Sequence, residues 1–534
     1  MFRISRSTVG PTAGAAEARS AGMLVALAVA GLTCLVFLPA LGGGFLPWDD
    51  ESNLVANRAW RGLGPAQLGW MLTSFHKGHW IPVTWLSFAF DHVIWGMDPR
   101  GYHLTNVLIH GANAGLVCLL VMRLLEAGRG VEGAGRLAGG AAAALVFALH
   151  PLRVESVAWV TERRDVLSAF FFLLAALAYL RAVREEPIWR SRWSWLALGA
   201  FALSLGSKSM AVSLPVVLLI LDAYPLARAS GGTWRARLIE KAPFALLSLL
   251  AAAIAMIAVR SGGSASSLAD LGVAQRLAIS SYSVVFYLWK TLVPLGLSPL
   301  YELPLDLDAG SPVYRLSVTV VAAITAAALA LRRRWPWLLA AWAAYLVMLL
   351  PVVGIAHNGP QITADRYTYL PCLPWAILLG GLVSVLWRRA WSIAVAAVVV
   401  GCLAWLTVGQ VRVWHDAETL WTHALATAPS AIAHSSFGVT LDERGRTDEA
   451  ITHFQQALRV NPRLAHAENN WGIALAKQGR WEEAARHYEA ALRIDPRYAE
   501  AHANLALALG RLGRYADAQR HLEQARAIVL SRTR

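Results

Sequence analysis

The sequence predicts an all-α protein, a polytopic membrane helix bundle followed by a C-terminal α-solenoid. Of its 534 residues, 56% are hydrophobic and only 15% are charged, whereas soluble globular proteins carry about 25% charged residues. The 23 Trp suit membrane interfaces. Near residue 411 the apolar runs give way to alternating apolar and charged sequence. We therefore expect a membrane domain over residues 1–410 and a repeat domain over residues 411–534.

Charge and motifs exclude several function classes. The net charge is +14, but Arg and Lys gather in short clusters between apolar runs, which indicates cytoplasmic loops and not a nucleic-acid surface. All four Cys lie in apolar segments, so neither a disulfide framework nor a thiolate metal site is expected. The sequence has no Gly-rich P-loop, nucleophile elbow or HExxH motif, which leaves soluble nucleotide hydrolysis and metalloprotease chemistry without support.

The first apolar run, residues 24–41, is longer than the apolar core of a signal peptide. We interpret it as an uncleaved span with a cytoplasmic N-terminus. Three adjacent carboxylates follow it, including Asp49 and Asp50. Because like charges this close repel, such a cluster suits a general base or a metal beside a phosphate leaving group. Capping of a helix that begins near Ser52 is the alternative.

About eleven crossings are expected, and the tail then lies on the outer face. The run at 278–297 is treated as re-entrant or interfacial, because counting it as a crossing puts two later Arg clusters outside. If it crosses, the tail lies inside. Residues 193–205 and 210–223 are two short helices hinged at 206–209. The spans are expected at residues 24–41, 102–125, 137–149, 166–182, 193–205, 210–223, 243–259, 313–331, 337–353, 370–387 and 391–409.

The tail repeats with a period of 34 residues, which spaces Gly445, Gly479 and Gly513. Alanine, aromatic and proline positions follow the same period. This is the tetratricopeptide (TPR) pattern of paired helices. Three repeats are expected, preceded by a half-repeat around Trp421. Such arrays bind polypeptide segments in a groove, and a purely structural lid is the alternative.

Ionisable groups near membrane helices tend to line cavities or to pair with one another. The expected topology places several on one side of the bilayer, and Lys208 and Arg366 could hold a phosphate there. Each of these groups could instead have a purely structural role. Such roles are a hydrogen bond between helices, a helix end, an internally paired turn at 163–165, or a long charged side chain that reaches the membrane interface. The candidates are Asp49, Asp50, His103, Asn106, His110, His150, Glu155, Lys208 and Arg366.

The ordered series of short motifs resembles the GT-C glycosyltransferases, and among them the transmembrane and TPR-containing O-mannosyltransferases with their bacterial relatives. The resemblance covers nearly the whole chain and adds Arg164 and Tyr369 to the candidate substrate-binding residues. It runs through Trp48-Asp49-Asp50, Asn57, Tyr102-His103-Leu104-Thr105-Asn106, His110, His150-Pro151, Glu155, Arg164-Asp165-Val166-Leu167, Ser207-Lys208, Asp365-Arg366-Tyr367 and Tyr369-Leu370-Pro371, and it ends in the repeats.

The resemblance implies a sugar donor on a polyprenyl phosphate, an acid in the first outer loop that acts at the acceptor hydroxyl, and inversion at the sugar carbon. Many members have an acid after the lysine, but here Ser209 follows Lys208. Donor identity does not carry over, so the sugar is mannose or another one. A divalent metal (Mg or Mn) on Asp49 and Asp50 is the cofactor considered.

The hypothesis is therefore an integral-membrane glycosyltransferase of the bacterial inner membrane that works at the periplasmic face. Asp49, or else Asp50, activates the acceptor, and Lys208 and Arg366 stabilise the lipid phosphate. The expected partners are the lipid-linked sugar, an acceptor polypeptide in the TPR groove and the lipid bilayer, with no nucleic acid. A non-catalytic TPR scaffold is the alternative. A lipid-linked-sugar transporter fits less well, because the polar groups cluster on one face.

Overall fold

The computed structural model describes residues 13–128, 131, 133–185, 187–228, 234–261, 271–354 and 359–532. The described chain is almost entirely helical, as predicted, with two short strands, β1 (Tyr301–Glu302) and β2 (Gln361–Thr363). It divides into two compact units. The first holds the apolar helices, and the second holds the repeats. Residues 46–48 and 298–307 belong to the second unit, which otherwise begins at Asp416.

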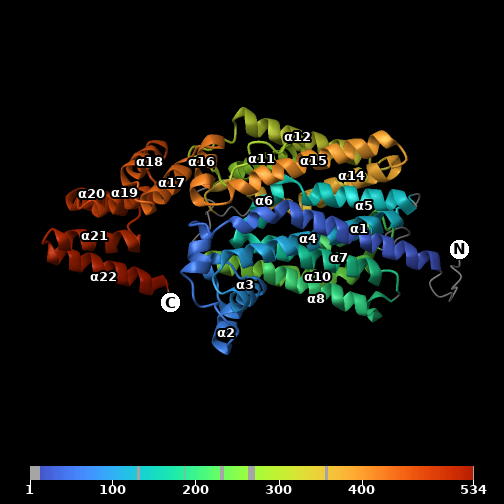
Figure 1. Ribbon diagram of the computed structural model, residues 1–534, viewed down its shortest axis with the longest axis horizontal. Coiled ribbons are helices and arrows are strands. Elements are labelled where there is room, and N and C mark those ends of the chain that lie inside the picture. Colours follow the sequence, from blue (N-terminus) through green and yellow to red (C-terminus); the bar gives the residue numbers. More distant parts are fainter. Residues whose placement is uncertain are drawn as a thin grey trace. The chain divides into compact units, whose positions relative to one another are not determined.

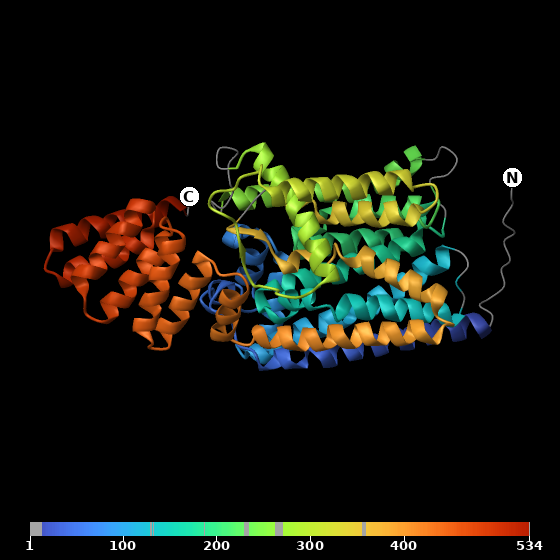
Figure 2. The same ribbon diagram turned by 90° about the horizontal axis from the view of Figure 1, so that it is seen from above.

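The helices of the first unit are mostly long and apolar, and α1, α4, α7 and α8 run side by side (Figures 1 and 2). Their lipid-compatible surface includes many exposed Leu, Ile, Val and Trp side chains. The helices are α1 (Ala13–Phe37), α2 (Pro65–Thr73), α3 (Pro82–Trp95), α4 (Pro99–Ala127), α5 (Gly133–Ala148), α6 (Val154–Ala158), α7 (Arg163–Ala182), α8 (Arg192–Ser207), α9 (Leu214–Ala223), α10 (Trp234–Ser261), α11 (Val273–Leu292), α12 (Pro312–Ala330), α13 (Pro336–Leu349), α14 (Leu373–Leu386) and α15 (Ala390–Val413).

Six of the described helices are long and apolar enough to cross a membrane, or seven if α5 and the segment Pro151–Ala158, bent by 58°, form one span. The other spans expected from the sequence are shorter apolar helices, which include Ser209–Ala223, α13 and α14. Residues 278–292 of the segment expected to be re-entrant or interfacial lie in one continuous helix, α11, which is not among the six. The chain is thus a polytopic membrane protein.

Small residues allow the membrane helices to approach closely. A Cβ added at Gly139 of α5 would lie only 2.5 Å from the carbonyl oxygen of Gly380 in α14, and the converse holds for Gly380. Close backbone approach of this kind gives van der Waals contact where the hydrophobic effect supplies no force between helices. An Ala at either position would therefore force α5 and α14 apart.

In the second unit, one helix precedes three helix pairs. Helix α16 (Ala417–Thr427) is the half-repeat, and three helix pairs follow. The glycines at the 34-residue period have positive φ, with +79° at Gly445, +76° at Gly479 and +77° at Gly513. Each ends the turn between the paired helices, where a residue with Cβ would be strained. The pairs are α17 (Ala431–Glu443) with α18 (Thr447–Val460), α19 (Ala465–Lys477) with α20 (Trp481–Ile494), and α21 (Ala499–Arg511) with α22 (Tyr515–Arg532).

Candidate active site

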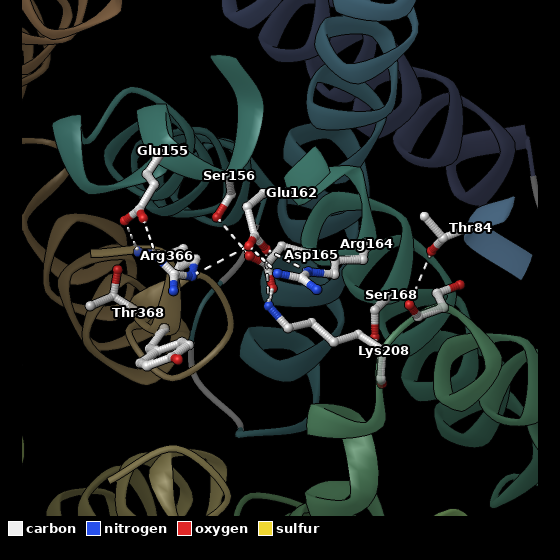
Figure 3. Close-up of polar contacts among 12 residues, drawn as sticks. Thr84, Glu155, Ser156, Glu162, Arg164, Asp165, Ser168, Lys208, Arg366 and Thr368 are labelled. Carbon is white, nitrogen blue, oxygen red and sulfur yellow. Dashed lines mark hydrogen bonds and ion pairs between the residues drawn. The ribbon is translucent and has the colours of Figure 1, made fainter. Parts of the chain in front are cut away.

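A buried carboxylate, Glu162, lies at the centre of the candidate site, just before α7. It accepts hydrogen bonds from Arg164 at 2.5 and 3.0 Å and from the Lys208 ammonium at 3.2 Å. The Nε of Arg366 lies 3.4 Å from Oε1 of Glu162, an oxygen that also accepts from Arg164. Figure 3 shows Glu162 between Arg366 and the pair formed by Arg164 and Lys208. One carboxylate with no exposed surface therefore holds three cations.

Two further acids balance these cations. The Lys208 ammonium lies 2.6 Å from Asp165, whose other oxygen accepts from the Ser156 hydroxyl at 3.2 Å. Glu155 forms an ion pair with the Arg366 guanidinium and also accepts from the Arg366 backbone N–H at 2.7 Å. Buried charges are tolerated only when they are paired and hydrogen-bonded, and here three acids face three bases.

Breaks in the helices place these groups. Pro151 starts a short 3-10 turn after α5, and His150 caps it by accepting from the Leu152 N–H at 3.3 Å. The chain then forms α6 and a second 3-10 turn, Val160–Glu162, so that Glu155 and Glu162 lie on short elements and not within a long helix. Short turns of this type are frequent connectors between helices.

Two other segments complete the cluster. Lys208 follows the last residue of α8 in extended conformation, and the Ser207 carbonyl accepts from the Thr84 hydroxyl at 3.0 Å. Arg366 lies in the 3-10 turn Asp365–Thr368. Buried Arg153 donates to the Thr368 carbonyl at 2.7 Å and so holds this turn in place.

The two aspartates have different surroundings. Asp50 is fully buried, and its Oδ1 accepts from the backbone N–H and the hydroxyl of Thr161 at 2.9 and 2.5 Å. Asp49 remains partly accessible, and its carboxylate accepts no hydrogen bond from the described residues. Burial raises the pKa of Asp49, while Arg164 and Arg366 act to lower it. Asp50 thus ties the loop to the Glu162 turn, and Asp49 lies within electrostatic range of Arg164 and Arg366.

His79 shares these surroundings. Burial by the surrounding protein and the charges of Arg164 and Lys208 lower the pKa of His79. The imidazole is therefore neutral at physiological pH and adds no further charge to the cluster. His79 was not among the predicted site residues.

The histidines at the start of α4 lie apart from this cluster and bind structural partners. His103 lies 3.4 Å from the Gly44 carbonyl oxygen. His110 is fully buried, with Nδ1 2.6 Å from the Tyr369 hydroxyl and Nε2 3.0 Å from the Ala148 carbonyl oxygen. These contacts connect α4 with α5 and with the segment that carries Arg366.

Asn106 and His150 also have structural partners. Asn106 accepts from Arg163 at 2.7 Å and donates to the Val157 carbonyl at 3.1 Å. His150 Nε2 lies 3.1 Å from the Thr291 carbonyl oxygen. Of the predicted residues, the structure brings together Asp49, Glu155, Arg164, Lys208 and Arg366, and it places His103, Asn106, His110, His150 and Tyr369 in the surrounding scaffold.

Glu162 and Asp165 were not predicted as members of the site. The internally paired turn at 163–165 that the sequence offered as an alternative does not form, because Arg163 pairs with Asp91 at 2.5 Å and Asp165 pairs with Lys208. A usable signal was present, because the run Glu162 to Asp165 carries four charges at the start of an apolar span. Charges at such a position require partners or function.

The site residues do not form a ready-made metal site. Among the described residues, no group of three or more His, Cys, Asp or Glu side chains could hold a metal ion. Asp50 already accepts two hydrogen bonds from Thr161 through one oxygen, whereas a divalent cation such as Mg²⁺ needs free carboxylate oxygens. Asp50 therefore has no free Oδ1 for a metal, and the metal expected on Asp49 and Asp50 stays a prediction.

Comparison with known proteins matches both units. The TPR repeat family matches residues 472–513, and a second tetratricopeptide family matches residues 499–529. The human protein O-mannosyl-transferase TMTC1 is 25% identical over 85% of this chain and 57% of its own length. The Xenopus laevis protein O-mannosyl-transferase tmtc2 is 31% identical over 38% of this chain and 24% of its own. The solved second TPR of Spaghetti (RPAP3) covers 18% of this chain and 92% of its own, with 23% identity and a TM-score of 0.18.

Proposed function

We propose that this chain, a relative of the transmembrane and TPR-containing protein O-mannosyltransferases, is a membrane glycosyltransferase. It moves a sugar from a polyprenyl-phosphate donor to a hydroxyl of a polypeptide acceptor. The chain spans 57% of the human relative and shares similarity with it over 85% of its own length. The observation that carries the proposal is the Glu162 cluster of Arg164, Lys208 and Arg366, of which Arg164 and Arg366 act electrostatically on the partly accessible Asp49. Mannose is the proposed sugar because the relatives carry that name.

Asp49 acts as the general base. Its carboxylate accepts the proton of the acceptor hydroxyl while the acceptor oxygen bonds to the anomeric carbon of the sugar. The bond between that carbon and the phosphate oxygen breaks, and its electron pair leaves with the polyprenyl phosphate. Attack opposite the leaving group inverts the carbon. A pKa raised by burial suits this role, because a carboxylate with a higher pKa is the stronger base.

Lys208 and Arg366 stabilise the charge that develops on the leaving phosphate. Both are held by carboxylates, Lys208 by Glu162 and Asp165, and Arg366 by Glu155. These acids orient the cations before the donor binds, so little reorganisation is needed as the phosphate departs. Arg366 presents a planar guanidinium that suits phosphate oxygens, and Lys208 presents a point charge.

The test compares the two aspartates in a transfer assay with polyprenyl-phosphate-mannose and an acceptor polypeptide. Asp49→Asn removes the base and should lower kcat at least about 100-fold. Asp50→Asn keeps an oxygen that accepts from Thr161, and it should keep activity within about tenfold of the wild type. Both variants should reach the membrane at wild-type levels. Full activity of Asp49→Asn excludes the mechanism.

A cellular comparison separates the enzyme from a scaffold. Mass spectrometry of exported proteins, with and without the gene, should show hexose on Ser or Thr that disappears with the gene. Cells that carry only Asp49→Asn should resemble the deletion. A scaffold that assembles other proteins through its repeats predicts instead that Asp49→Asn changes nothing, while removal of residues 416–532 abolishes all function.

A further inference from the structure

A cavity of about 250 Å³ lies at the other end of α7, where α4 and α7 finish. Arg123, Arg184 and Arg228 line it, together with apolar Ala127, Leu180, Val183 and Leu226. None of these residues belongs to the candidate active site. Three guanidinium groups beside an apolar wall make this lining complementary to an acidic lipid, whose negative phosphate adjoins apolar chains.

The arginines around the cavity outnumber the carboxylates that pair with them. Arg123 lies 3.0 Å and Arg184 lies 3.5 Å from the same oxygen of Glu126, and Arg136 also acts on this carboxylate. The side chains of Arg123 and Arg184 are 36% and 55% exposed. Each guanidinium carries five N–H donors, and the contacts to Glu126 use one donor of each. Arg123 and Arg184 therefore each retain N–H groups that can donate hydrogen bonds to an anion in the cavity.

The third arginine is held by a separate buried network. Arg228 donates to the Tyr179 hydroxyl and to Asp222, both at 2.9 Å, and to Glu240 at 3.2 Å. Lys241 pairs with Asp222 and Glu240, and Arg237 also pairs with Glu240. This network again contains one more cation than carboxylate, so the positive charge at the cavity is fixed in position.

The position along α7 places the cavity at a membrane boundary. Helix α7 has 20 residues, from Arg163 to Ala182, and it is about 30 Å long at 1.5 Å per residue. That length equals the thickness of a bilayer's hydrocarbon core. With the Glu162 cluster at one boundary, Leu180, Val183 and Arg184 lie at the other, at the depth of the lipid head groups.

We propose that this arginine cavity binds the phosphate head group of an acidic membrane phospholipid. The guanidinium groups of Arg123 and Arg184 donate to the phosphate oxygens, and Arg228 supplies fixed charge behind them. The apolar side chains contact the first carbons of the acyl chains. Basic pockets between membrane helices take acidic lipids in this way. The site is independent of the proposed glycosyl transfer.

The test uses the full chain in a neutral detergent, with native mass spectrometry and the unfolding temperature as the two readouts. The probes are phosphatidylglycerol, cardiolipin, phosphatidylcholine and inorganic phosphate. Phosphatidylglycerol and cardiolipin should remain bound and raise the unfolding temperature. Equal binding of phosphatidylcholine would overturn the proposal, because the arginines would then play no part. Equal stabilisation by inorganic phosphate would also overturn it, because the lipid chains would then be irrelevant.

The variants remove two charges inside or outside the cavity. Arg123→Gln with Arg184→Gln should weaken binding of the acidic lipid about 25-fold, since each arginine near an acidic lipid contributes about fivefold. The matched control, Arg190→Gln with Arg235→Gln, removes two exposed arginines that do not line the cavity and should bind like the wild type. Equal binding by both double variants refutes the site.

Discussion

At the scale of single residues, the two aspartates show how environment separates identical side chains. Asp50 has no exposed surface and holds Thr161 through two hydrogen bonds, whereas Asp49 keeps an accessible carboxylate within range of Arg164 and Arg366. Adjacent positions in a sequence give no means of telling them apart, because both follow the same apolar run. The contact with Thr161, 111 residues away, makes the distinction.

The raised pKa of Asp49 predicts an acid limb in the pH profile of kcat/KM. Burial raises this pKa above the usual value for Asp of about 3.9, and Arg164 lowers it in part. Transfer needs the carboxylate, so activity should rise as the pH increases through that pKa. Arg164→Gln removes the first of the lowering charges and should move the limb to higher pH. An unmoved limb would mean that another group controls it.

The shared Glu162 carboxylate leads to a second prediction for a single residue, which concerns stability. Glu162→Gln removes the carboxylate that Arg164, Lys208 and Arg366 share. Leaving buried cations without their partner costs about 3–5 kcal/mol, so thermal unfolding in detergent should occur at a clearly lower temperature and activity should fall.

The matched control for Glu162 is Glu126→Gln. Glu126 also lies between two arginines, but its side chain is 37% exposed. Exposed ion pairs contribute about 0–1 kcal/mol, and this variant should unfold close to the wild-type temperature. Similar shifts for the two variants would show that burial does not set the difference.

At the scale of elements, the repeat helices pair through matched polar positions. The first helix of each repeat meets the second through residues 19 apart. His434 and His453 lie 3.0 Å apart through Nδ1, and His502 and His521 lie 2.9 Å apart. In the middle repeat, Glu468 occupies the corresponding position and lies 2.7 Å from His487. The repeat period therefore extends from the apolar contacts to the polar ones.

These histidine pairs predict that the repeat unit loses stability in acid. Burial lowers the pKa of His434, His453 and His521, and a neighbouring histidine lowers those of His434 and His521 further. A lowered pKa means that the neutral form favours the fold. Stability is then fully present above the unfolded pKa of about 6.5 and is lost as the pH falls through the folded values.

The measurement is the unfolding temperature of the full chain at pH 8 and at pH 5. His453→Gln with His521→Gln should shrink the difference between the two temperatures. The control is His466→Gln, which removes an exposed histidine bonded to the Tyr498 hydroxyl, and it should leave the difference unchanged. If the double variant keeps the full acid sensitivity, the pairs are not its source.

At the scale of the whole molecule, the membrane unit carries charge at both ends of α7 and almost none between them. The Glu162 cluster lies at its start, and Arg184 follows its end. The intervening residues 166–180 contain no Asp, Glu, Lys or Arg. This arrangement follows from the cost of charge in the hydrocarbon core. It separates the proposed transfer site and the proposed lipid site by one bilayer thickness.

The sequence by itself determined the helical membrane unit and the three repeats. Apolar run length and the 34-residue period are local properties, because they depend on residues within a helix or a helix pair. Asp49, Glu155, Lys208 and Arg366 stood out as candidates because charges are rare in such a chain, and the family resemblance added Arg164; their roles stay predictions.

Only the tertiary structure decided which charges are partners. Glu155 meets Arg366 across 211 residues, and Glu162 meets Lys208 across 46. The same packing brings His110 within hydrogen-bond distance of the Tyr369 hydroxyl, and it places Glu162 between the cations of the cluster. Ion pairs and hydrogen bonds form wherever the folded helices bring polar groups within about 3 Å, and sequence separation does not measure that distance.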